Sequence, residues 1–120
     1  MDTVNGCLII GPSADGEFSR FGPAEVEGAY LAELVGGIRP GDPAPPVHVH
    51  PTTDEAFYLA SGEATFLLGR RDIRLTAGSF VFVPRGVTHT VWNSGTDPLR
   101  GLIVISPGGR EHIVQPVESG

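Results

Sequence analysis

The feature that most constrains the fold is the way glycine and proline divide the chain into short apolar runs. The 120 residues include 17 glycines and 11 prolines, which fall between the runs instead of gathering in one linker. Most runs are only a few residues long and rich in β-branched or aromatic side chains, a composition typical of strands. Turn residues placed so regularly indicate an all-β domain.

The apolar runs give the expected strands. They lie at residues 7–10, 29–38, 47–50, 55–60, 63–69, 72–77, 79–84, 89–93 and 100–106. The links at 61–62 and 69–71 contain glycine and are short enough for tight hairpins, so the three runs between 55 and 77 are predicted to form a meander. Residues 107–120 are expected to be a loosely attached tail or a final short strand.

The run at 29–38 also admits a second interpretation. Residues 24–35 can be drawn as a short amphipathic helix, with several apolar side chains on one face. We expect a strand because Gly28, Gly36 and Gly37 would weaken a helix at this place.

Length and charge narrow the class of protein. A chain of this length forms one domain, 1–120, with one core. Its net charge is -6, with eight arginines, fourteen acidic residues and no lysine, and no basic stripe that would bind nucleic acid.

Cys7, the single cysteine, cannot form an intrachain disulfide and is expected to act as a small hydrophobe. Without a signal peptide or an apolar run long enough to span a membrane, we expect a cytoplasmic protein.

Two of the four histidines lie one residue apart in the segment VHVHPTTDE. Side chains alternate along a strand, so His48 and His50 project from the same side, roughly 7 Å apart. The turn that follows brings Glu55, at the head of the next strand, back towards them. His89 begins a later run, and if the strands close into a barrel these four side chains could surround one metal ion.

Two strand histidines alone are weak evidence for a metal site, because they could simply lie on the surface. The acid strengthens the hypothesis. Glu55 heads the apolar run EAFYLA, and a half-buried carboxylate needs a partner, of which a cation is the simplest. His112 lies in the C-terminal tail and is expected to be exposed and without a role.

The spacing of these residues resembles the cupin superfamily. Its first motif, G-x5-H-x-H-x(3,4)-E-x6-G, is similar to the segment from Gly41 to Gly62, although six residues separate Gly41 from His48 here. Its second motif, G-x5-P-x-G-x2-H-x3-N, matches the segment from Gly78 to Asn93 at every position. The resemblance implies a single-domain jelly-roll β-barrel, with motif 1 at 41–62 and motif 2 at 78–93.

The resemblance also implies that His48, His50, Glu55 and His89 hold one divalent transition metal. Three imidazoles and a carboxylate suit Fe, Mn, Ni, Cu, Co or Zn better than Mg or Ca. A structural site would more often be closed and rich in cysteine, so we expect a functional ion. Glu55 is also a candidate general base for a metal-bound substrate.

Strand alternation suggests which residues form a substrate pocket beside these ligands. Phe57 and Leu59 share the side of Glu55, and Val91 shares that of His89. Phe66, together with Phe80 or Phe82, is expected to join them in an apolar cavity for a flat hydrophobic substrate. Tyr58 and Trp92 point away by parity and are candidates for the barrel exterior or a subunit contact.

The resemblance is strongest to small bacterial monocupins related to quercetin 2,3-dioxygenase. This similarity implies oxygenation of an enolic or phenolic small molecule by O2, with Glu55 taking the hydroxyl proton. A cyclase or aromatase of polyketide or other secondary metabolism, using the ion as a Lewis acid, is the second hypothesis. A non-catalytic ligand-binding barrel is the third, and a sugar isomerase would need more polar walls. Family members commonly form homodimers, and the segment 29–38 could supply the contact.

Overall fold

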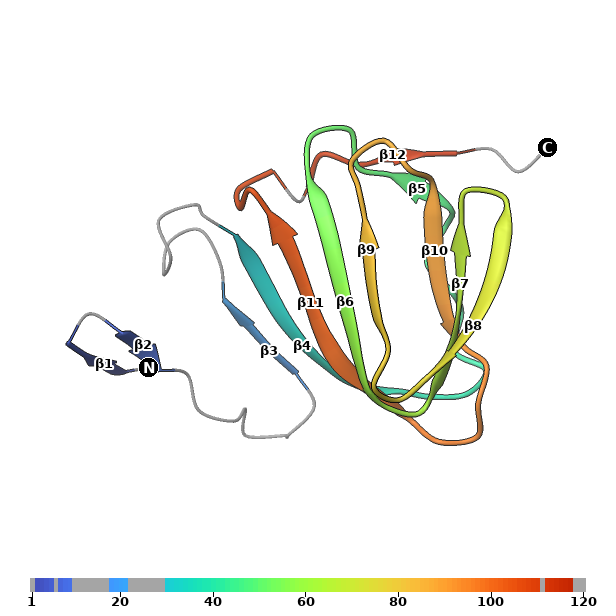
Figure 1. The fold of residues 1–120 in the computed structure, drawn as a ribbon, viewed down its shortest axis with the longest axis horizontal. Helices are drawn as coiled ribbons and strands as arrows, with labels where there is room; N and C mark the ends of the chain where they lie inside the picture. The colour runs from blue at the N-terminus through green and yellow to red at the C-terminus, as the bar shows by residue number, and fades with distance from the viewer. Residues whose placement is uncertain (1, 6, 10–17, 22–29, 111, 118–120) are drawn as a thin grey trace.

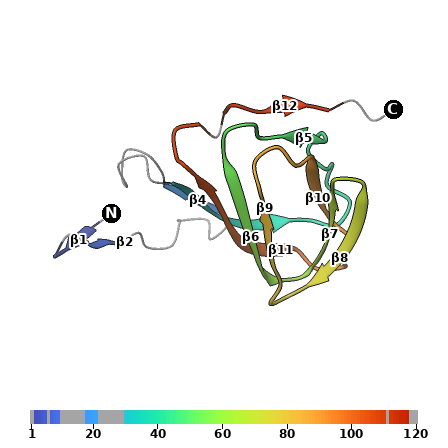
Figure 2. The ribbon, with the colours of Figure 1, turned by 45° about the horizontal axis from the view of Figure 1, so that its top comes forward.

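The computed structural model describes residues 2–5, 7–9, 18–21, 30–110 and 112–117, and every regular element in these ranges is a β-strand. The strands form two five-stranded antiparallel sheets that face each other, with a separate two-stranded hairpin near the N-terminus (Figures 1 and 2). The predicted all-β jelly roll is confirmed. Within the described ranges no helix is long and apolar enough to cross a membrane.

The twelve described strands have the following bounds: β1 Asp2–Val4, β2 Cys7–Ile9, β3 Phe18–Phe21, β4 Leu31–Ile38, β5 His48–Val49, β6 Asp54–Ser61, β7 Glu63–Leu68, β8 Arg71–Thr76, β9 Phe80–Val83, β10 His89–Asn93, β11 Leu99–Ser106 and β12 Gln115–Pro116. One large sheet has the order β12-β5-β10-β7-β8, and the other has the order β3-β4-β11-β6-β9. Strands that follow each other in sequence therefore often belong to opposite sheets.

Each predicted strand is confirmed within a few residues, and β1 and β3 are strands that the apolar runs did not indicate. Residues 24–29, the first half of the alternative helix, lie outside the described ranges, while 31–38 form β4. β4 lies between β3 and β11, so both of its edges are paired. The suggested subunit contact through 29–38 stays a prediction.

The predicted meander is wrong in its first half. β7 and β8 form the expected hairpin, but β6 pairs with β11 and β9 in the other sheet. The short link at Ser61 and Gly62 crosses from one sheet to the other, and Gly62 has a φ of 91°, a conformation that favours glycine. A tight turn fixes where the chain reverses, but not which sheet the next strand joins.

The register of β6 and β9 decides which side chains face the barrel interior. Glu55 lies opposite Val83, and Phe57 lies opposite Val81. Directly opposed residues in an antiparallel pair point to the same side, so both valines turn inward with Glu55. They are 3% and 8% exposed. The buried core around them consists of Phe57, Leu59, Ala64, Phe66, Val81, Val83 and Leu99.

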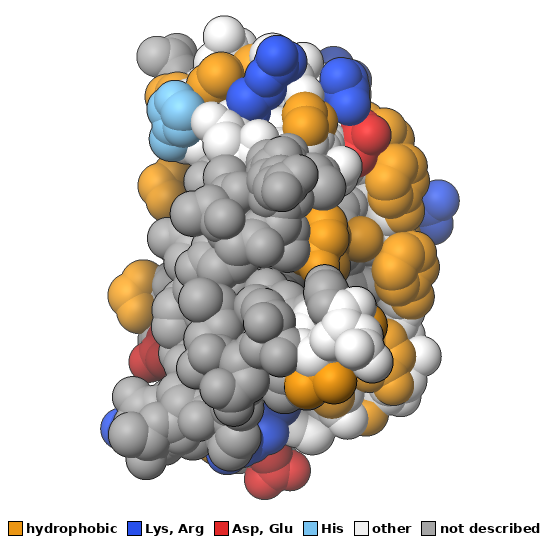
Figure 3. Space-filling model, turned by 90° about the vertical axis from the view of Figure 1, so that its left-hand side faces the viewer, with side chains coloured by type: hydrophobic (Ala, Val, Ile, Leu, Met, Phe, Trp, Pro, Cys, Tyr) orange, Lys and Arg blue, Asp and Glu red, His pale blue; other side chains and the backbone are white. Residues whose placement is uncertain are grey.

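The same register places Phe80 and Phe82 outside the barrel, where they are 65% and 55% exposed. The prediction that one of them lines the pocket is therefore wrong. Tyr58 shares this outer face as expected and is also exposed, whereas Trp92 is half-buried. Hydrophobic side chains are visible along one margin of the molecule in Figure 3.

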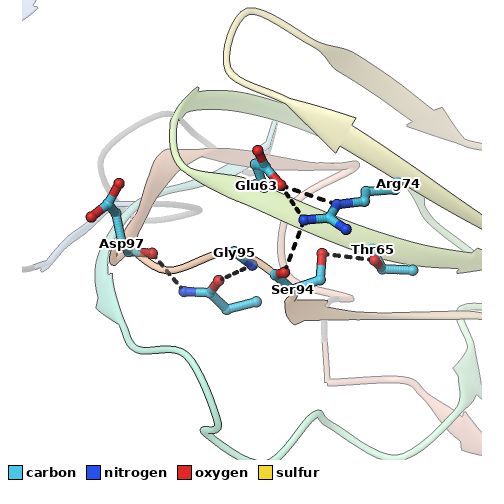
Figure 4. Close-up of polar contacts among 7 residues, drawn as sticks. Glu63, Thr65, Arg74, Ser94, Gly95 and Asp97 are labelled. Atoms are coloured by element: carbon cyan, nitrogen blue, oxygen red, sulfur yellow. Dashed lines mark hydrogen bonds and ion pairs between the residues drawn. The ribbon is translucent and has the colours of Figure 1, made fainter.

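The end of the barrel beside Asn93 is closed by polar contacts. The Asn93 amide donates to the carbonyls of Ile38 and Asp97, both at 2.9 Å, and its oxygen accepts from the Gly95 N–H at 2.9 Å. Arg74 pairs with Glu63 and donates to the Ser94 carbonyl, as Figure 4 shows. Every polar group of the Asn93 side chain therefore has a protein partner.

The C-terminal segment follows the second of the two expected alternatives, a short final strand. β12 pairs with β5, with Pro116 opposite His48, and the Val117 N–H donates to the Val47 carbonyl at 2.9 Å. The segment thus runs along the strand that carries His48. His112 is exposed, as predicted.

Candidate metal centre

Four side chains from three strands and one loop meet at the end of the barrel opposite Asn93. His48 lies on β5, His50 follows that strand, Glu55 lies near the start of β6 and His89 begins β10. Strand pairing brings them together, since His89 lies directly opposite His48. One ligand atom from each of the four residues lies within 4.8 Å of the other three.

The distances suit a single ion. Glu55 Oε2 lies 3.0 Å from His50 Nε2 and 3.1 Å from His89 Nε2. Ligands on opposite sides of one ion are about 4.2 Å apart, twice a metal–nitrogen bond of about 2.1 Å. The ligand atoms lie within 4.8 Å of one another, so the largest separation needs only a small contraction to fit opposite sides of one ion. His50, Glu55 and His89 are buried, and His48 is half-buried.

Backbone carbonyls orient two of the imidazoles. Nδ1 of His48 lies 2.7 Å from the Pro46 carbonyl, and Nδ1 of His89 lies 3.0 Å from the Val87 carbonyl. A carbonyl can only accept, so Nδ1 carries the proton and donates it in both rings. In the neutral form of each ring the Nε2 lone pair is then free for a metal, a tautomer control typical of metal-binding histidines. Without an ion, Nε2 of His89 can carry a second proton and donate it to Glu55.

His50 differs from the other two histidines. Its Nδ1 is buried and has no hydrogen-bond partner among the described residues. The backbone of Ile113 is close enough to act on the pKa of His50 but makes no hydrogen bond of ordinary geometry. The other nitrogen, Nε2, faces Glu55 at 3.0 Å and is therefore the candidate metal ligand of this ring.

Burial and charge set the protonation of these rings. Burial lowers the pKa of His50 below its ordinary value, and the nearby His48 and His89 lower it further, against the opposing charge of Glu55. Burial also acts to lower the pKa of His89, but the hydrogen bond to Glu55 and the Val87 carbonyl outweigh it and raise that pKa. His50 is therefore held in the neutral form that a metal requires.

An ion pair joins the two loops that carry the ligands. The Arg85 N–H donates to Asp54 Oδ1 at 2.9 Å, and its guanidinium Nε lies 3.2 Å from the same oxygen. The Arg85 side chain thereby lowers the pKa of Asp54. The Gly86 N–H donates to the His50 carbonyl at 2.9 Å. These contacts hold the loop before His89 against the loop between His50 and Glu55.

A cavity of about 260 Å³ opens from the ligands into the barrel. Its walls beyond the ligands are mainly apolar and consist of Pro45, Phe57, Thr90, Val91 and Ile103. The Thr90 hydroxyl donates to the Pro45 carbonyl at 2.7 Å, so its proton is already engaged. Glu55 is the one carboxylate among the described residues that line this cavity.

The structure separates the predicted pocket residues into three groups. Phe57 and Val91 line the cavity beside the ligands, as the alternation indicated. Leu59 and Phe66 face inward but line a second, deeper cavity. The third group, Phe80 and Phe82, lies outside.

Ile103 and Pro45 line the ligand cavity but were missed by the sequence interpretation. Ile103 is in a run that is apolar on both faces, so alternation alone gives it no direction. A third and more open cavity, of about 310 Å³, is lined by Pro46, His48, His50, Val114 and Pro116. The sequence interpretation allowed a short final strand in the C-terminal segment but did not place that segment beside the ligands.

Comparison with known proteins identifies a family whose match includes all four candidate ligands. A family model described as "Cupin domain" matches residues 35–106. The tetracenomycin polyketide synthase protein TcmJ of Streptomyces glaucescens is 35% identical over 60 residues, which are 50% of this chain and 40% of TcmJ. The chain thus spans less than half the length of that relative.

Two further similarities extend over most of the chain. The oxalate-binding protein of Thermotoga maritima is 30% identical over 96 residues, covering 72% of this chain and 79% of that protein. The crystal structure of a conserved protein with a double-stranded β-helix domain from Klebsiella pneumoniae superposes with a TM-score of 0.69 at 25% identity, covering 92% and 91% of the two chains.

Proposed function

The chain belongs to the cupin family, and we propose that it is a metal-dependent enzyme that oxygenates a small apolar substrate bearing an enol or phenol hydroxyl. The observation that carries this proposal is the meeting of three imidazoles and one carboxylate at the mouth of an apolar cavity. This donor set suits Fe, Mn, Ni, Cu, Co or Zn. A bound ion would supply a Lewis acid for the substrate oxygen and a redox centre for O2.

The residues of the chain have separate roles in this proposal. Glu55 faces both the histidines and the cavity, so its carboxylate is placed to accept the hydroxyl proton of a substrate. The apolar walls at Phe57, Val91 and Ile103 would hold a flat ring and exclude water. Excluding water strengthens the electrostatic interactions in the site.

A second candidate is a cyclase or aromatase that needs no O2. It is favoured by the similarity to TcmJ, whose name places that protein in a polyketide synthase. An enolic polyketide would present the same type of oxygen, and Glu55 would again move a proton. The two candidates share the ligands and differ in whether oxygen atoms enter the product.

A third candidate, ligand binding without catalysis, draws support from the name of the oxalate-binding relative. The cavity of this chain is a poor match to that ligand. A dianion such as oxalate could bind the metal ion itself, but the described lining of the cavity adds no arginine to that ion, includes Glu55 and is otherwise mainly apolar. We therefore propose a neutral, mainly apolar ligand.

Metal analysis followed by assays with and without O2 tests the proposal. Protein reconstituted with each of the six metals would be incubated with small phenols and enolic diketones, and products would be examined by mass spectrometry. Oxygenation predicts O2 consumption and a product that has gained oxygen atoms. Turnover of equal rate without O2, with a product that has gained none, would support the cyclase and contradict the oxygenase.

Glu55→Gln tests the proton-transfer role, and its matched control is Glu63→Gln, a carboxylate that does not line the ligand cavity and whose side chain is 41% exposed. We expect Glu55→Gln protein that retains its metal to lose turnover while it still binds substrate, and the control to keep full activity. Unchanged turnover in Glu55→Gln protein that retains its metal would show that another group takes the proton.

A further inference from the structure

The barrel interior is built in rows set by the strand register. Beneath the row that contains Glu55, Ile103 lies opposite Phe57 on one sheet, and Val91 lies opposite Phe66 on the other. The rings of Phe57 and Phe66 meet edge to face, with centroids 5.2 Å apart. This row forms the floor under the metal ligands.

A second, smaller cavity of about 60 Å³ lies beyond that row. Phe57, Val91 and Ile103 line both cavities and therefore form the partition between them. The lining of the deeper cavity includes the buried apolar side chains of Leu59, Phe66 and Leu99. Tyr58, Arg100 and Leu102 also line this cavity, which is not fully enclosed, but its surface is almost wholly apolar and therefore suits an apolar group.

Small residues occupy the next row and line the deeper cavity. Gly101 lies opposite Leu59, and Ala64 lies opposite Asn93. A Cβ on Gly101 would lie 2.3 Å from the Tyr58 carbonyl oxygen, at a register shift between Arg100 and Gly101. The close approach of the backbone therefore excludes a side chain at 101.

The size of the upper cavity limits the substrate. Cavities that hold drug-sized ligands are about 300–1,000 Å³, and the upper cavity is about 260 Å³. A single ring with a short substituent suits this space, whereas a multi-ring compound would need the partition to move. Of the three partition residues, Ile103 lies on β11, which carries none of the four ligands.

We propose that Ile103 determines substrate length: it restricts the site to one-ring phenols or enols with short substituents, and the deeper cavity is the space that a longer apolar substituent would enter. This inference rests on the proposed function for the class of substrate. The ring lies in the upper cavity with its hydroxyl towards Glu55, and the substituent points at the partition. Shortening Ile103 joins the two cavities.

Binding of 4-alkylphenols of increasing chain length to the metal-loaded protein tests this inference by calorimetry. In the native protein, affinity should rise with the first carbons and then fall when the chain reaches the partition. In Ile103→Ala the rise should continue for about two more methylenes, each adding about fourfold, the equivalent of ~0.8 kcal/mol per buried CH2. Ile103→Val should shift the chain-length limit in the same direction by a smaller amount. It provides the test if the alanine variant folds poorly.

Val104→Ala is the matched control, because Val104 is the next residue on β11, faces the opposite side and lines neither cavity. Its chain-length profile should equal that of the native protein. An unchanged length limit in both Ile103 variants would overturn the inference.

The same series of alkylbenzenes, which lack the hydroxyl, separates the two proposals. If alkylbenzenes show the shift in Ile103→Ala while no phenol binds more tightly than its benzene counterpart, the cavity inference stands and the proposed substrate chemistry is wrong. If the phenols bind more tightly than the benzenes and neither series shows a shift in the length limit, the proposed substrate chemistry stands and the cavity inference is wrong.

Discussion

The two ends of the barrel carry polar residues of the same two motifs, but these residues are satisfied in different ways. At one end the Asn93 side chain makes three hydrogen bonds to backbone groups. At the other end the Nε2 atoms of His50 and His89 both face a single Glu55 oxygen. The first arrangement is complete without any ligand, whereas the second leaves donors and acceptors directed at a common point.

This difference separates two reasons for a polar residue to be buried. A saturated side chain such as Asn93 stabilises loops, because each buried backbone group that it pairs would otherwise be unsatisfied. A cluster such as the four candidate ligands costs free energy in the empty protein, which a cation would recover. Substitutions at the two ends should therefore affect different measured quantities.

The largest expected effect is on metal affinity. His48→Ala should weaken binding of a divalent transition metal by more than the ~100-fold that loss of a supporting residue around a metal can cause. Its free energy of unfolding in chelator should change by less than ~1 kcal/mol, because the side chain is half-buried. Metal titration and urea unfolding measure the two quantities, with the exposed His112→Ala as control. Unchanged affinity in the His48 variant would remove it from the ligand set.

Metal binding should in turn stabilise the native protein. At a free metal concentration 100 times the dissociation constant, the expected gain is ~2.7 kcal/mol in the free energy of unfolding. Urea unfolding with metal and with chelator measures it. The gain should disappear in His48→Ala at the same metal concentration, and an equal gain in that variant would point to a site elsewhere.

Asn93→Ala should have the opposite pattern. Loss of the amide leaves two carbonyls and one N–H without their partner, at a cost of about 2 kcal/mol of stability, reduced where water replaces it. Urea unfolding should show this loss, while the metal-bound protein keeps one ion per chain. If Asn93→Ala instead kept native stability and lost its metal, Asn93 would serve metal binding and not the stability of its end of the barrel.

The smallest effect is expected for Arg74→Met. The Arg74 and Glu63 side chains are 61% and 41% exposed, and surface ion pairs are worth roughly 0–1 kcal/mol. Urea unfolding at low and high salt should find a loss below ~1 kcal/mol that shrinks with salt. A loss as large as that of Asn93→Ala would mean that the ion pair, and not the amide, holds this end together.

The sequence predicted the four clustered residues better than it predicted their surroundings. Glu55 and the three histidines follow from motif spacing and strand alternation, which are local properties. Phe80 and Phe82 could not be oriented, because Val81 and Val83 make β9 apolar on both faces. Only the pairing of β9 with β6 settled which face was buried.

The sequence interpretation missed Ile103 and wrongly predicted a hairpin at 61–62 for related reasons. Ile103 lies in a strand that is apolar on both sides, so its direction depends on its partner Phe57. The link is as short as a hairpin turn but connects two sheets. Both errors concern the pairing of strands far apart in the chain, which cannot be inferred from the spacing of residues along the sequence.

X-ray absorption spectroscopy of the metal-loaded protein tests the central claim most directly. The account predicts one divalent transition metal per chain, with scattering from the imidazole rings of His48, His50 and His89 and from an oxygen of Glu55. A substoichiometric ion, or an ion whose spectrum lacks imidazole scattering, would contradict it.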